Sequence, residues 1–465
     1  MSEKQTFNMD EEFAGLDFNS KRLEKRFVRT METLSKHPEK SILSCSENRA
    51  EAKAIYRMLG NDALNQNEIQ RNHREATIKR MIESESVILA VQDTTSINYH
   101  THKNTEGLGY MHSTSATRGV DVHSCLAVTT SGLALGLLDQ RYFTREEAKT
   151  GLEPGEGPSE DEKKNREFHE KESYRWLESF EASTAGLPEG VKVITVCDRE
   201  GDIYEFMDAV DSKKQIFLIR IAQNRMTVDN QRVLDAIGET SSKGKVTVEI
   251  PRNSHKKQKA REGVLDIRFG RFEIKKPHRL NKNQTVSDSI TVWVVHAREE
   301  NPPSGVEPVE WFLMTNEPVE TFEAAYERVK YYTQRWKIER FHFVLKSGCQ
   351  IKKLQERSVE KINLLVLMYS IIAVAIMNLT YIARIHPDVT CSVFFEEEEW
   401  KVLYCAANKT KDAPEKPYSM QDAVKYLGWL GGPKMAPSDG PPGLKTIWTG
   451  LDRLNTLLTY REWLV

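Results

Sequence analysis

The stretches SVILAVQD, at residues 86–93, and VKVITVCD, at residues 191–198, decide the fold of this chain. Each is a short apolar run, rich in β-branched residues, that ends in an aspartate, as a buried central strand would. Similar runs occur at residues 120–130, 133–143 and 215–222. Because helical patterns flank these runs, the sequence predicts a mixed α/β core with a largely buried sheet.

Composition places the chain among folded globular proteins. Its 465 residues allow about three domains of roughly 150 residues each. Hydrophobic residues make up 39% and charged residues 29%, values that exclude wholesale disorder. The six cysteines form no closely spaced pairs, so neither a thiolate zinc site nor a disulfide framework is expected.

The chain is nearly neutral, with a net charge of −2 and a pI near 6.7. A site for a polyanion therefore has to be a local basic patch. The first residues, MSEKQTFNMDEEF, lack the apolar segment of a secretion signal, so we expect a cytoplasmic location. The longest apolar stretch, residues 364–377, is shorter than the ~20 residues of a membrane helix and is predicted to be a buried core helix.

The patterning predicts three regions along the chain. Residues 1–70 are expected to be helical, with Gly60 ending one of the helices. Residues 71–370 hold the sheet, and an insertion at about residues 229–310 is expected to be mostly β. Residues 371–465 are expected to be helical again. In detail, we expect a long surface loop at 144–169, strands at 245–250, 264–269, 272–276 and 290–297, and helices at 322–348 and 359–385.

Two segments are strongly basic. Residues 252–282 hold eleven Lys or Arg against three acidic residues, a local net charge of 11 − 3 = +8. Such a density of like charge favours contact with nucleic acid. The helical stretch at residues 21–29 carries five Lys or Arg and one glutamate, a pattern that an ordinary solvated helix face would also explain.

The helix expected at residues 322–348 carries a polar stripe. At 100° per residue, the side chains of five residues fall within about 80° of one another. They are Tyr332, Arg335, Glu339, His342 and Lys346. The stripe fits either a site for a charged ligand or a row of solvated ion pairs.

Aspartates that end buried strands favour a site for a charged ligand over a row of solvated ion pairs. Carboxylates are rarely placed on buried strands unless they are paired or bind a cation. Asp93, Asp198 and Glu339 could together hold two Mg²⁺ ions for phosphoryl transfer, with Mn²⁺ as a substitute. Glu200 and Asp202 compete with Asp198 for this role, because spacing alone does not separate them.

Three segments resemble the DDE transposases of the insertion-sequence-four family. They are QDTTSINY at residues 92–99, VCDREGDIY at residues 196–204, and the spacing Tyr332-x2-Arg335-x3-Glu339-x6-Lys346. The resemblance extends from about residue 12 to the C-terminal helix. It implies a ribonuclease-H-like core in which Asp93, Asp198 and Glu339 are the catalytic and metal-binding triad.

The resemblance also implies residues that contact DNA. Tyr332, Arg335 and Lys346 would hold phosphates, and Trp311 would stack on a base flipped out of the duplex, although a core tryptophan would fit the same position. Other expected contacts are Arg220, Arg225, Arg22 and Arg26. Trp336 fits a core position as well as a contact. One departure is Ser20, where the family commonly has an acidic residue, and the loop at residues 144–169 is longer than in the family.

The function implied is cut-and-paste transposition of DNA. The protein would bind the inverted repeats of its element as a synaptic homodimer, held by the helical C-terminal region, and would cut through a hairpin intermediate and join the 3′-hydroxyl ends to target DNA. In a bacterial cell it would be associated with the nucleoid. Two alternatives remain open: a DNA-binding regulator without catalysis, and a metal-dependent nuclease that never joins strands.

Overall fold

A computed structural model describes residues 8–111, 117–145, 167–250, 261–278, 280, 285–433 and 440–461. The chain forms two compact units. The sheet unit comprises residues 87–93 and 151–336, and the helix-rich unit comprises residues 1–86, 94–150 and 337–465. Most of the loop expected at 144–169 and much of the basic segment 252–282 lie outside the described residues.

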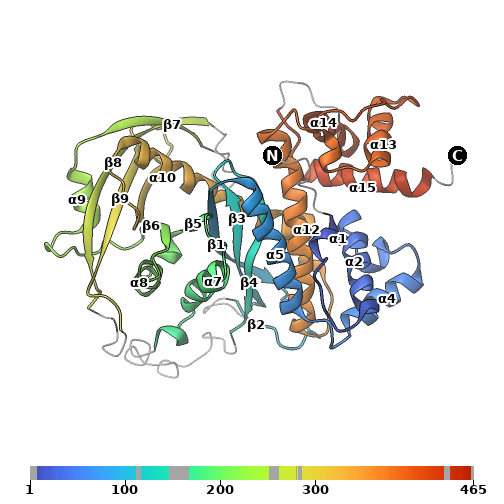
Figure 1. Cartoon of the computed structure of the whole chain (residues 1–465), viewed down its shortest axis with the longest axis horizontal. Coiled ribbons are helices and arrows are strands. Elements are labelled where there is room, and N and C mark those ends of the chain that lie inside the picture. Colours follow the sequence, from blue (N-terminus) through green and yellow to red (C-terminus); the bar gives the residue numbers. More distant parts are fainter. Residues whose placement is uncertain are drawn as a thin grey trace. The chain divides into compact units, whose positions relative to one another are not determined.

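The sheet unit contains a mixed sheet with the strand order β1-β5-β6-β10-β9-β8-β7. Strand β5 (Lys192–Cys197) is parallel to β1 (Val87–Asn98) and to β6 (Ile216–Arg220). The remaining strands pair antiparallel: β10 (Glu310–Thr315), β9 (Ser289–Glu299), β8 (Arg261–Lys275) and β7 (Gly244–Ile250). The strands predicted at the two aspartate-ended stretches are therefore neighbours, and the mixed sheet is as predicted (Figure 1).

Helices of the sheet unit pack on this sheet through aromatic and aliphatic side chains. They are α7 (Tyr174–Thr184), α8 (Tyr204–Ser212), α9 (Val233–Glu239) and α10 (Phe322–Gln334), with short 3-10 turns at η1 (Phe168–Glu170) and η2 (Arg199–Gly201). Trp176, Phe180 and Phe206 are fully buried and share one core with strand residues such as Ile219 and Val292. Burial of side chains of this size supplies most of the favourable free energy of such a layer.

The insertion has the expected β character, with one difference. Residues 264–269 and 272–276 were expected to form separate strands, but both belong to β8. Strand β8 pairs with β9 without interruption from Leu265 to Lys275, through Gly270 and Arg271. A glycine inside an alternating pattern is compatible with a continuous strand when a neighbour pairs on both sides of it.

The helix-rich unit begins with α1 (Met9–Glu12), α2 (Lys21–Lys36), α3 (Ile42–Cys45), α4 (Arg49–Leu59) and α5 (Gln66–Ser84). Gly60 caps the end of α4, as predicted. The strands of this unit are β2 (Gly109–Tyr110), β3 (Arg118–Thr129) and β4 (Ala134–Phe143), and β3 pairs with both of the others. Its later helices are α11 (Trp336–Phe343), η3 (Val344–Gly348), η4 (Ile351–Lys353), α12 (Val359–Ile385), η5 (Cys391–Val393), α13 (Glu397–Asn408), α14 (Met420–Gly431) and α15 (Leu444–Arg461).

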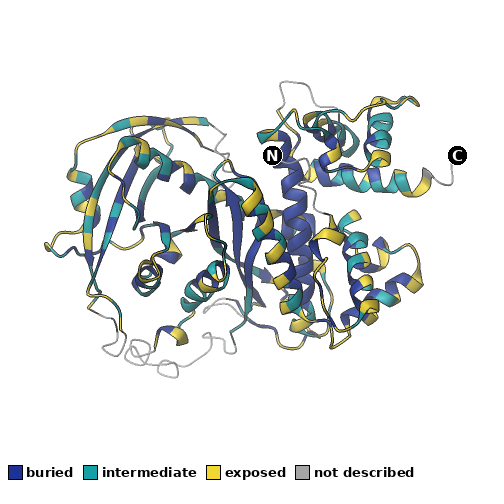
Figure 2. Cartoon of the chain, viewed as in Figure 1, coloured by how far each residue is buried: buried dark blue, intermediate teal, exposed yellow. Residues whose placement is uncertain are grey.

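Helix α12 is the core helix of this unit, as the sequence predicted. It packs against α2, α5, β4, α14 and α15, and every residue from Leu364 to Ala383 is buried (Figure 2). By length and composition alone α12 is apolar enough to cross a membrane, but 94% of its most apolar window is buried inside the protein. Protein neighbours therefore cover the surface that lipid would cover in a membrane helix.

A buried acidic group joins α1, α5 and β4. Glu12 accepts hydrogen bonds from His73, through Nδ1, and from Arg80 Nη1 at 2.7 Å. The backbone N–H of Leu137 donates to His73 Nε2 at 2.9 Å, so the ring carries its proton on Nδ1. Burial alone would raise the pKa of Glu12, but the charges and hydrogen bonds of His73 and Arg80 outweigh it and lower the pKa to about 2.

Glu12→Gln is expected to remove part of the acid sensitivity of the fold. Because the pKa of Glu12 in the folded chain lies below its ordinary 4.5, its contribution is complete above pH 4.5 and is lost as the pH falls toward 2. That loss is about 3 kcal/mol. Urea unfolding from pH 6 to pH 2.5 measures it, with the exposed Glu181→Gln as the control. Parallel pH profiles for wild type and Glu12→Gln would contradict this expectation.

Candidate active site

The two predicted catalytic aspartates lie at the same level of neighbouring parallel strands. Val91 of β1 pairs with Val196 of β5, and Asp93 and Asp198 each follow two residues later. Parallel neighbours lie about 4.8 Å apart, so the two side chains come from adjacent backbone positions. Ligand sites of α/β sheets occur at this carboxyl edge.

Asp93 does not end its strand, which corrects the sequence prediction. Strand β1 continues to Asn98, although its pairing with β5 stops at Val91. Apart from the buried Ile97 the extension is polar, and it pairs with β3 in the helix-rich unit, where Thr94 hydrogen-bonds His123 at 2.8 Å and Ser96 donates to Asp121. Asp93 therefore marks the end of the β1–β5 ladder rather than the end of the strand.

Contacts in the structure separate Asp198 from its two competitors. Asp202 is fully buried and binds Arg225, with Oδ1 at 2.6 Å from Nη2, while its Oδ2 accepts the N–H groups of Ala222 and Gln223. Glu200 is 62% exposed and pairs with Arg175 at 3.1 Å. Asp198 is half-buried and accepts the N–H of Glu200, and it is the acid of this segment whose charge acts on Tyr332.

Tyr332 and two arginines surround the aspartates. Arg335 Nη1 lies 4.0 Å from Asp93 Oδ2, and its guanidinium lies 5.7 Å from the centre of the Tyr332 ring. Burial raises the pKa of Tyr332, and the charge of Asp198 adds to that increase, whereas Arg335 and Arg220 oppose it. The sheet unit thus brings together five of the predicted site residues.

Arg220 is placed by the backbone of the next strand. It is the last residue of β6, and its Nη2 donates to the carbonyl oxygen of Glu310 at 3.0 Å. Burial lowers its pKa; the nearby cations Arg199 and Arg335 act in the same direction, and Tyr332 acts against them. A cluster of three arginines at a carboxylate edge is suited to a group that carries more than one negative charge, such as a phosphodiester backbone.

Trp311, the second residue of β10, lies beside Tyr332 of α10. The two ring centres are 5.7 Å apart with an interplanar angle of 65°. Trp311 is half-buried, so part of its indole surface is open, unlike that of a core tryptophan. Trp336, for which the sequence left core and contact equally open, is 42% exposed.

Arg225 does not have the position expected of a DNA contact. Its side chain is 5% exposed, and its guanidinium donates to Asp202 through both Nε and Nη2. The ion pair holds the segment after β6 against the turn after β5, which carries Asp198. The structure therefore gives Arg225 a positioning role.

Glu339 and Lys346 belong to the helix-rich unit. The helix predicted as continuous over 322–348 consists of α10, then Arg335 as a helical cap residue, then α11, then η3. Turn η3 is a π-helical turn, in which i→i+5 bonding reduces the rotation per residue. The side-chain direction of Lys346 therefore differs from the one that a regular helix with 100° per residue would give. Glu339 is half-buried and follows Arg335 by one helical turn.

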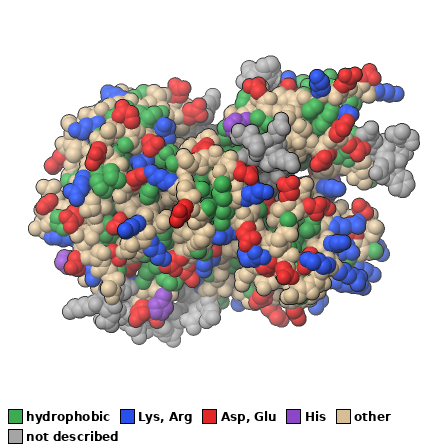
Figure 3. Space-filling model, in the orientation of Figure 1, with side chains coloured by type: hydrophobic (Ala, Val, Ile, Leu, Met, Phe, Trp, Pro, Cys, Tyr) green, Lys and Arg blue, Asp and Glu red, His purple; other side chains and the backbone are tan. Residues whose placement is uncertain are grey.

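The predicted basic stretch at residues 21–29 forms one surface of α2. A groove of about 420 Å³ is lined by five cations: Lys21, Arg22, Lys25, Arg26 and Arg29. Figure 3 shows Lys and Arg side chains gathered over the α2–α4 region. Lys21 pairs with Glu24 at 2.8 Å and Arg29 with Glu51 at 3.4 Å. In the described part of the chain the other three form no ion pair.

Sequence reasoning missed Arg199 and Glu310 as parts of the site, and it counted Lys25 in the basic stretch without naming it as a DNA contact. Arg199 follows Asp198 directly and contributes charge beside Arg220. Lys25 is one turn from Arg22 and adjoins Arg26, so helical spacing could have added it to the expected DNA contacts. The Glu310 carbonyl accepts the hydrogen bond of Arg220 only because β6 pairs with β10, and no sequence pattern near either residue indicates this contact.

The donor set fits a hard divalent cation. Carboxylate oxygens are ligands that Mg²⁺ prefers, and Asp93 and Asp198 supply them from adjacent positions. Within the residues that the structure describes, no three Asp, Glu, His or Cys side chains form a ready-made metal site. Mg²⁺ suits such an arrangement, since it commonly takes one or two carboxylates and completes its shell with waters and substrate phosphates.

Three family models match the chain in consecutive segments. Residues 8–64 match a model described as Transposase DNA-binding. Residues 175–375 match the Transposase DDE domain, and residues 371–461 match the Transposase Tn5 dimerisation domain. The DDE match confirms the predicted ribonuclease-H-like core, and the other two matches coincide with the helical N-terminal and C-terminal regions.

A solved structure with similarity to the chain is described as "Cryo-EM structure of piggyBac transposase synaptic complex with hairpin DNA (SNHP)". It shares 10% sequence identity with a TM-score of 0.35, and the match covers 78% of this chain and 66% of that chain. At this level of similarity it supports no argument about the site.

Proposed function

We propose, from the premise that this chain belongs to the Tn5-type DDE transposases of the insertion-sequence-four family, that it is a cut-and-paste DNA transposase. It would bind the inverted repeats at the ends of its element, cut the DNA by phosphoryl transfer and join the 3′-hydroxyl ends to target DNA. The observation that carries the proposal is the pair Asp93 and Asp198, at one level of adjacent strands and beside the Tyr332–Arg335 cluster.

The catalytic triad that we propose is Asp93, Asp198 and Glu339. These residues would hold two Mg²⁺ ions, which Mn²⁺ could replace. When bound, such ions activate a water or hydroxyl nucleophile and stabilise the leaving oxygen. Glu339 is assigned to the triad because α11 places it one turn after Arg335, which itself contacts Asp93.

The other residues of the cluster would hold and orient the DNA. Arg335 and Arg220 offer guanidinium groups to backbone phosphates, and the Tyr332 hydroxyl and Lys346 ammonium extend this contact. Charge that develops on a phosphate in the transition state is stabilised best by donors fixed beforehand. The Arg220–Glu310 hydrogen bond and the Arg335–Tyr332 stacking provide that fixation.

The order of strand cuts that we propose follows the resemblance to the family. A water nicks one strand, the freed 3′-hydroxyl attacks the opposite strand to give a hairpin, a second water opens the hairpin, and the 3′-hydroxyl then attacks target DNA. Residues 1–70 would bind the transposon end through Arg22 and Arg26, residues 71–370 would catalyse, and residues 371–465 would hold the dimer. One subunit would then recognise the end that its partner cuts, at the nucleoid in the cytoplasm.

The experiment that tests this function incubates purified wild type and Glu339→Ala with a duplex carrying the DNA that flanks the gene. Products formed with and without Mg²⁺ are resolved on a denaturing gel. Metal-dependent nicks and hairpins at the element boundary, absent with Glu339→Ala, support the transposase. Binding without cutting by both proteins favours a DNA-binding regulator, and nicks without hairpins or joined products favour a nuclease.

Trp311→Ala is expected to slow hairpin formation more than the first nick. Stacking of a flipped base on an aromatic ring contributes about 1–3 kcal/mol, so the hairpin step should slow by about 5- to 150-fold. Time courses of nicked and hairpin products measure the two steps separately. Trp311→Phe keeps an aromatic face and should recover most of the rate, whereas equal slowing of both steps would argue against stacking.

A further inference from the structure

Three cations lie close to aromatic rings on α11 and α12, and two of them share the ring of Tyr381. Lys337 Nζ lies 3.6 Å from the centre of the Tyr381 ring, and the Arg384 guanidinium lies 5.6 Å from the same centre. Arg340, one turn after Lys337, has its guanidinium 5.6 Å from the ring of Phe343, which is 42% exposed. Both α12 residues and all of these α11 residues belong to the helix-rich unit.

Among the residues that the structure describes, no acidic side chain neutralises this cluster. Lys337, Arg340 and Arg384 form no ion pair in the part of the chain that the structure describes. Like charges held this close repel one another, and a bound anion would remove that cost.

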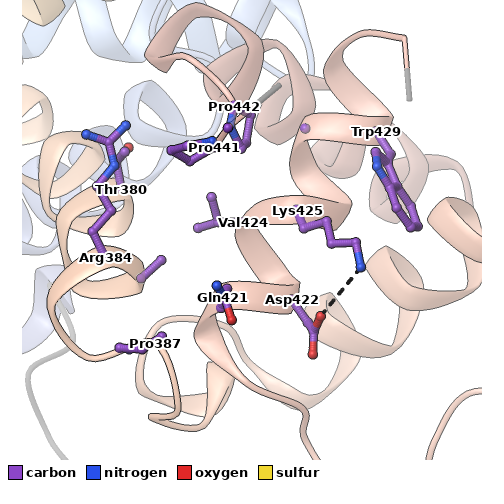
Figure 4. A pocket seen from close by; sticks show the side chains of 13 residues that line it. Thr380, Arg384, Pro387, Gln421, Asp422, Val424, Lys425, Trp429, Pro441 and Pro442 are labelled. Carbon is purple, nitrogen blue, oxygen red and sulfur yellow. Dashed lines mark ion pairs between the residues drawn. The ribbon is translucent and has the colours of Figure 1, made fainter. Parts of the chain in front are cut away.

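Arg384 is the member of the cluster that an anion from outside would meet first, because it is exposed while Lys337 and Arg340 are half-buried. Arg384 is exposed and lines a cavity of about 760 Å³ between α12 and α14. Figure 4 shows Arg384 on the α12 side of this cavity and Lys425 with Trp429 on the α14 side. Asp422 is the one acid among the described lining residues, and it pairs with Lys425 at 4.0 Å rather than with Arg384.

We propose that Lys337, Arg340 and Arg384 bind backbone phosphates of DNA at a second site, separate from the catalytic residues. The inference rests on the proposed function for its ligand. On α11, Lys337 is about 160° away from Glu339, so the two side chains leave opposite sides of the helix. An α-helix with its side chains is about 10–12 Å across, a distance that one DNA segment spans easily. DNA held at Glu339 would therefore continue past the cation cluster.

DNA suits the cluster better than the acidic segment of a second copy does. The most acidic run of the sequence, residues 396–399, begins α13. Glu396 and Glu399 cap that helix reciprocally, and Glu397 pairs with Lys401, so these carboxylates are already in use. A DNA backbone instead presents regularly spaced phosphates, for which arginine has the matching geometry.

The first test measures salt dependence with the full-length protein. A fluorescein-labelled 20-base-pair duplex of unrelated sequence is titrated, without divalent metal, at several salt concentrations. Each phosphate contact contributes about 0.9 to the slope of log affinity against log salt. The double variant Lys337→Gln/Arg384→Gln should therefore lower the magnitude of the slope by about 1.8, equally for two unrelated sequences. Lys411→Gln, an exposed cation elsewhere in the same unit, should leave the slope unchanged.

The second test uses the wild-type chain and so does not depend on how the variants fold. Acetylation of Lys337 by a mild acylating reagent at pH 8 is followed by peptide mass spectrometry. The unrelated duplex should slow the modification at least threefold, because a phosphate contact shields the amine from the reagent. Unchanged acetylation together with an unchanged slope would overturn the proposal, and so would protection that rises with protein concentration in the absence of DNA, which would indicate a second copy.

Neither test requires catalysis, so the two proposals can fail separately. A protein that shows the slope change and the protection but makes no metal-dependent cuts would keep the second DNA site and lose the transposase function. A protein that cuts DNA normally and shows neither effect would keep the function and lose this site.

Discussion

Asp198→Asn should reduce metal-dependent DNA cleavage by at least about a thousandfold and leave end binding unchanged. The amide keeps the shape of the carboxylate and can still cap the turn that starts at Arg199, but it removes the negative charge that a divalent cation needs. A thousandfold corresponds to about 4 kcal/mol of transition-state stabilisation, within the several kcal/mol that metal-assisted charge neutralisation supplies.

Glu200→Gln is the matched control for this substitution. Glu200 lies two residues from Asp198, is exposed and pairs with Arg175, so its loss should leave the cleavage rate within about twofold. Cleavage is followed on denaturing gels and binding by fluorescence anisotropy, with each variant at equal concentration. If Glu200→Gln lost cleavage while Asp198→Asn kept it, the second acid of the triad would be Glu200.

Asp202→Ala should destabilise the fold by about 3–5 kcal/mol. The substitution leaves Arg225 buried without its carboxylate, and removal of one partner of a buried pair costs this much. It also removes the acceptor of two backbone N–H groups, those of Ala222 and Gln223. Urea unfolding followed by tryptophan fluorescence measures the change in the free energy of unfolding.

An exposed ion pair of the same length is the control. Lys213 and Glu181 are also 2.6 Å apart, but their side chains are 49% and 44% exposed. Glu181→Ala should therefore cost less than about 1 kcal/mol. Similar losses for Asp202→Ala and Glu181→Ala would show that burial does not set the strength of the Arg225 pair.

The sequence was sufficient for features that depend on local pattern. Apolar runs predicted the strands that lead to Asp93 and Asp198. Because both runs end in an aspartate, they suggested that the two carboxylates lie at the same edge of the sheet, as the parallel pairing of β1 and β5 shows. The length and uniform apolarity of residues 364–377 predicted a core helix, which α12 is. The Tyr332-x2-Arg335-x3-Glu339-x6-Lys346 spacing resembles the same family of transposases that the three family models describe.

Features that depend on contacts distant in sequence were beyond prediction. Strand β1 continues past Asp93 because it pairs with β3, whose His123 and Asp121 also bind Thr94 and Ser96 from 29 and 25 residues away. The family resemblance implied a DNA contact for Arg225, and nothing near it in sequence reveals the carboxylate that it binds. Its partner Asp202 is 23 residues earlier, and only the return of the chain through β6 brings the two together.

Helix α12 makes the order of synthesis important for this protein. Its covering elements α2, α5 and β4 precede it in the chain, whereas α14 and α15 are made last. When Ile385 has just left the ribosome, α12 has a membrane-like composition, and α2, α5 and β4 can already cover one of its sides. The side that α14 and α15 cover is still exposed to water at that moment. A message that stops before Met420 would leave that side exposed permanently, and its product would be a substrate for chaperones and proteases rather than a shorter working protein.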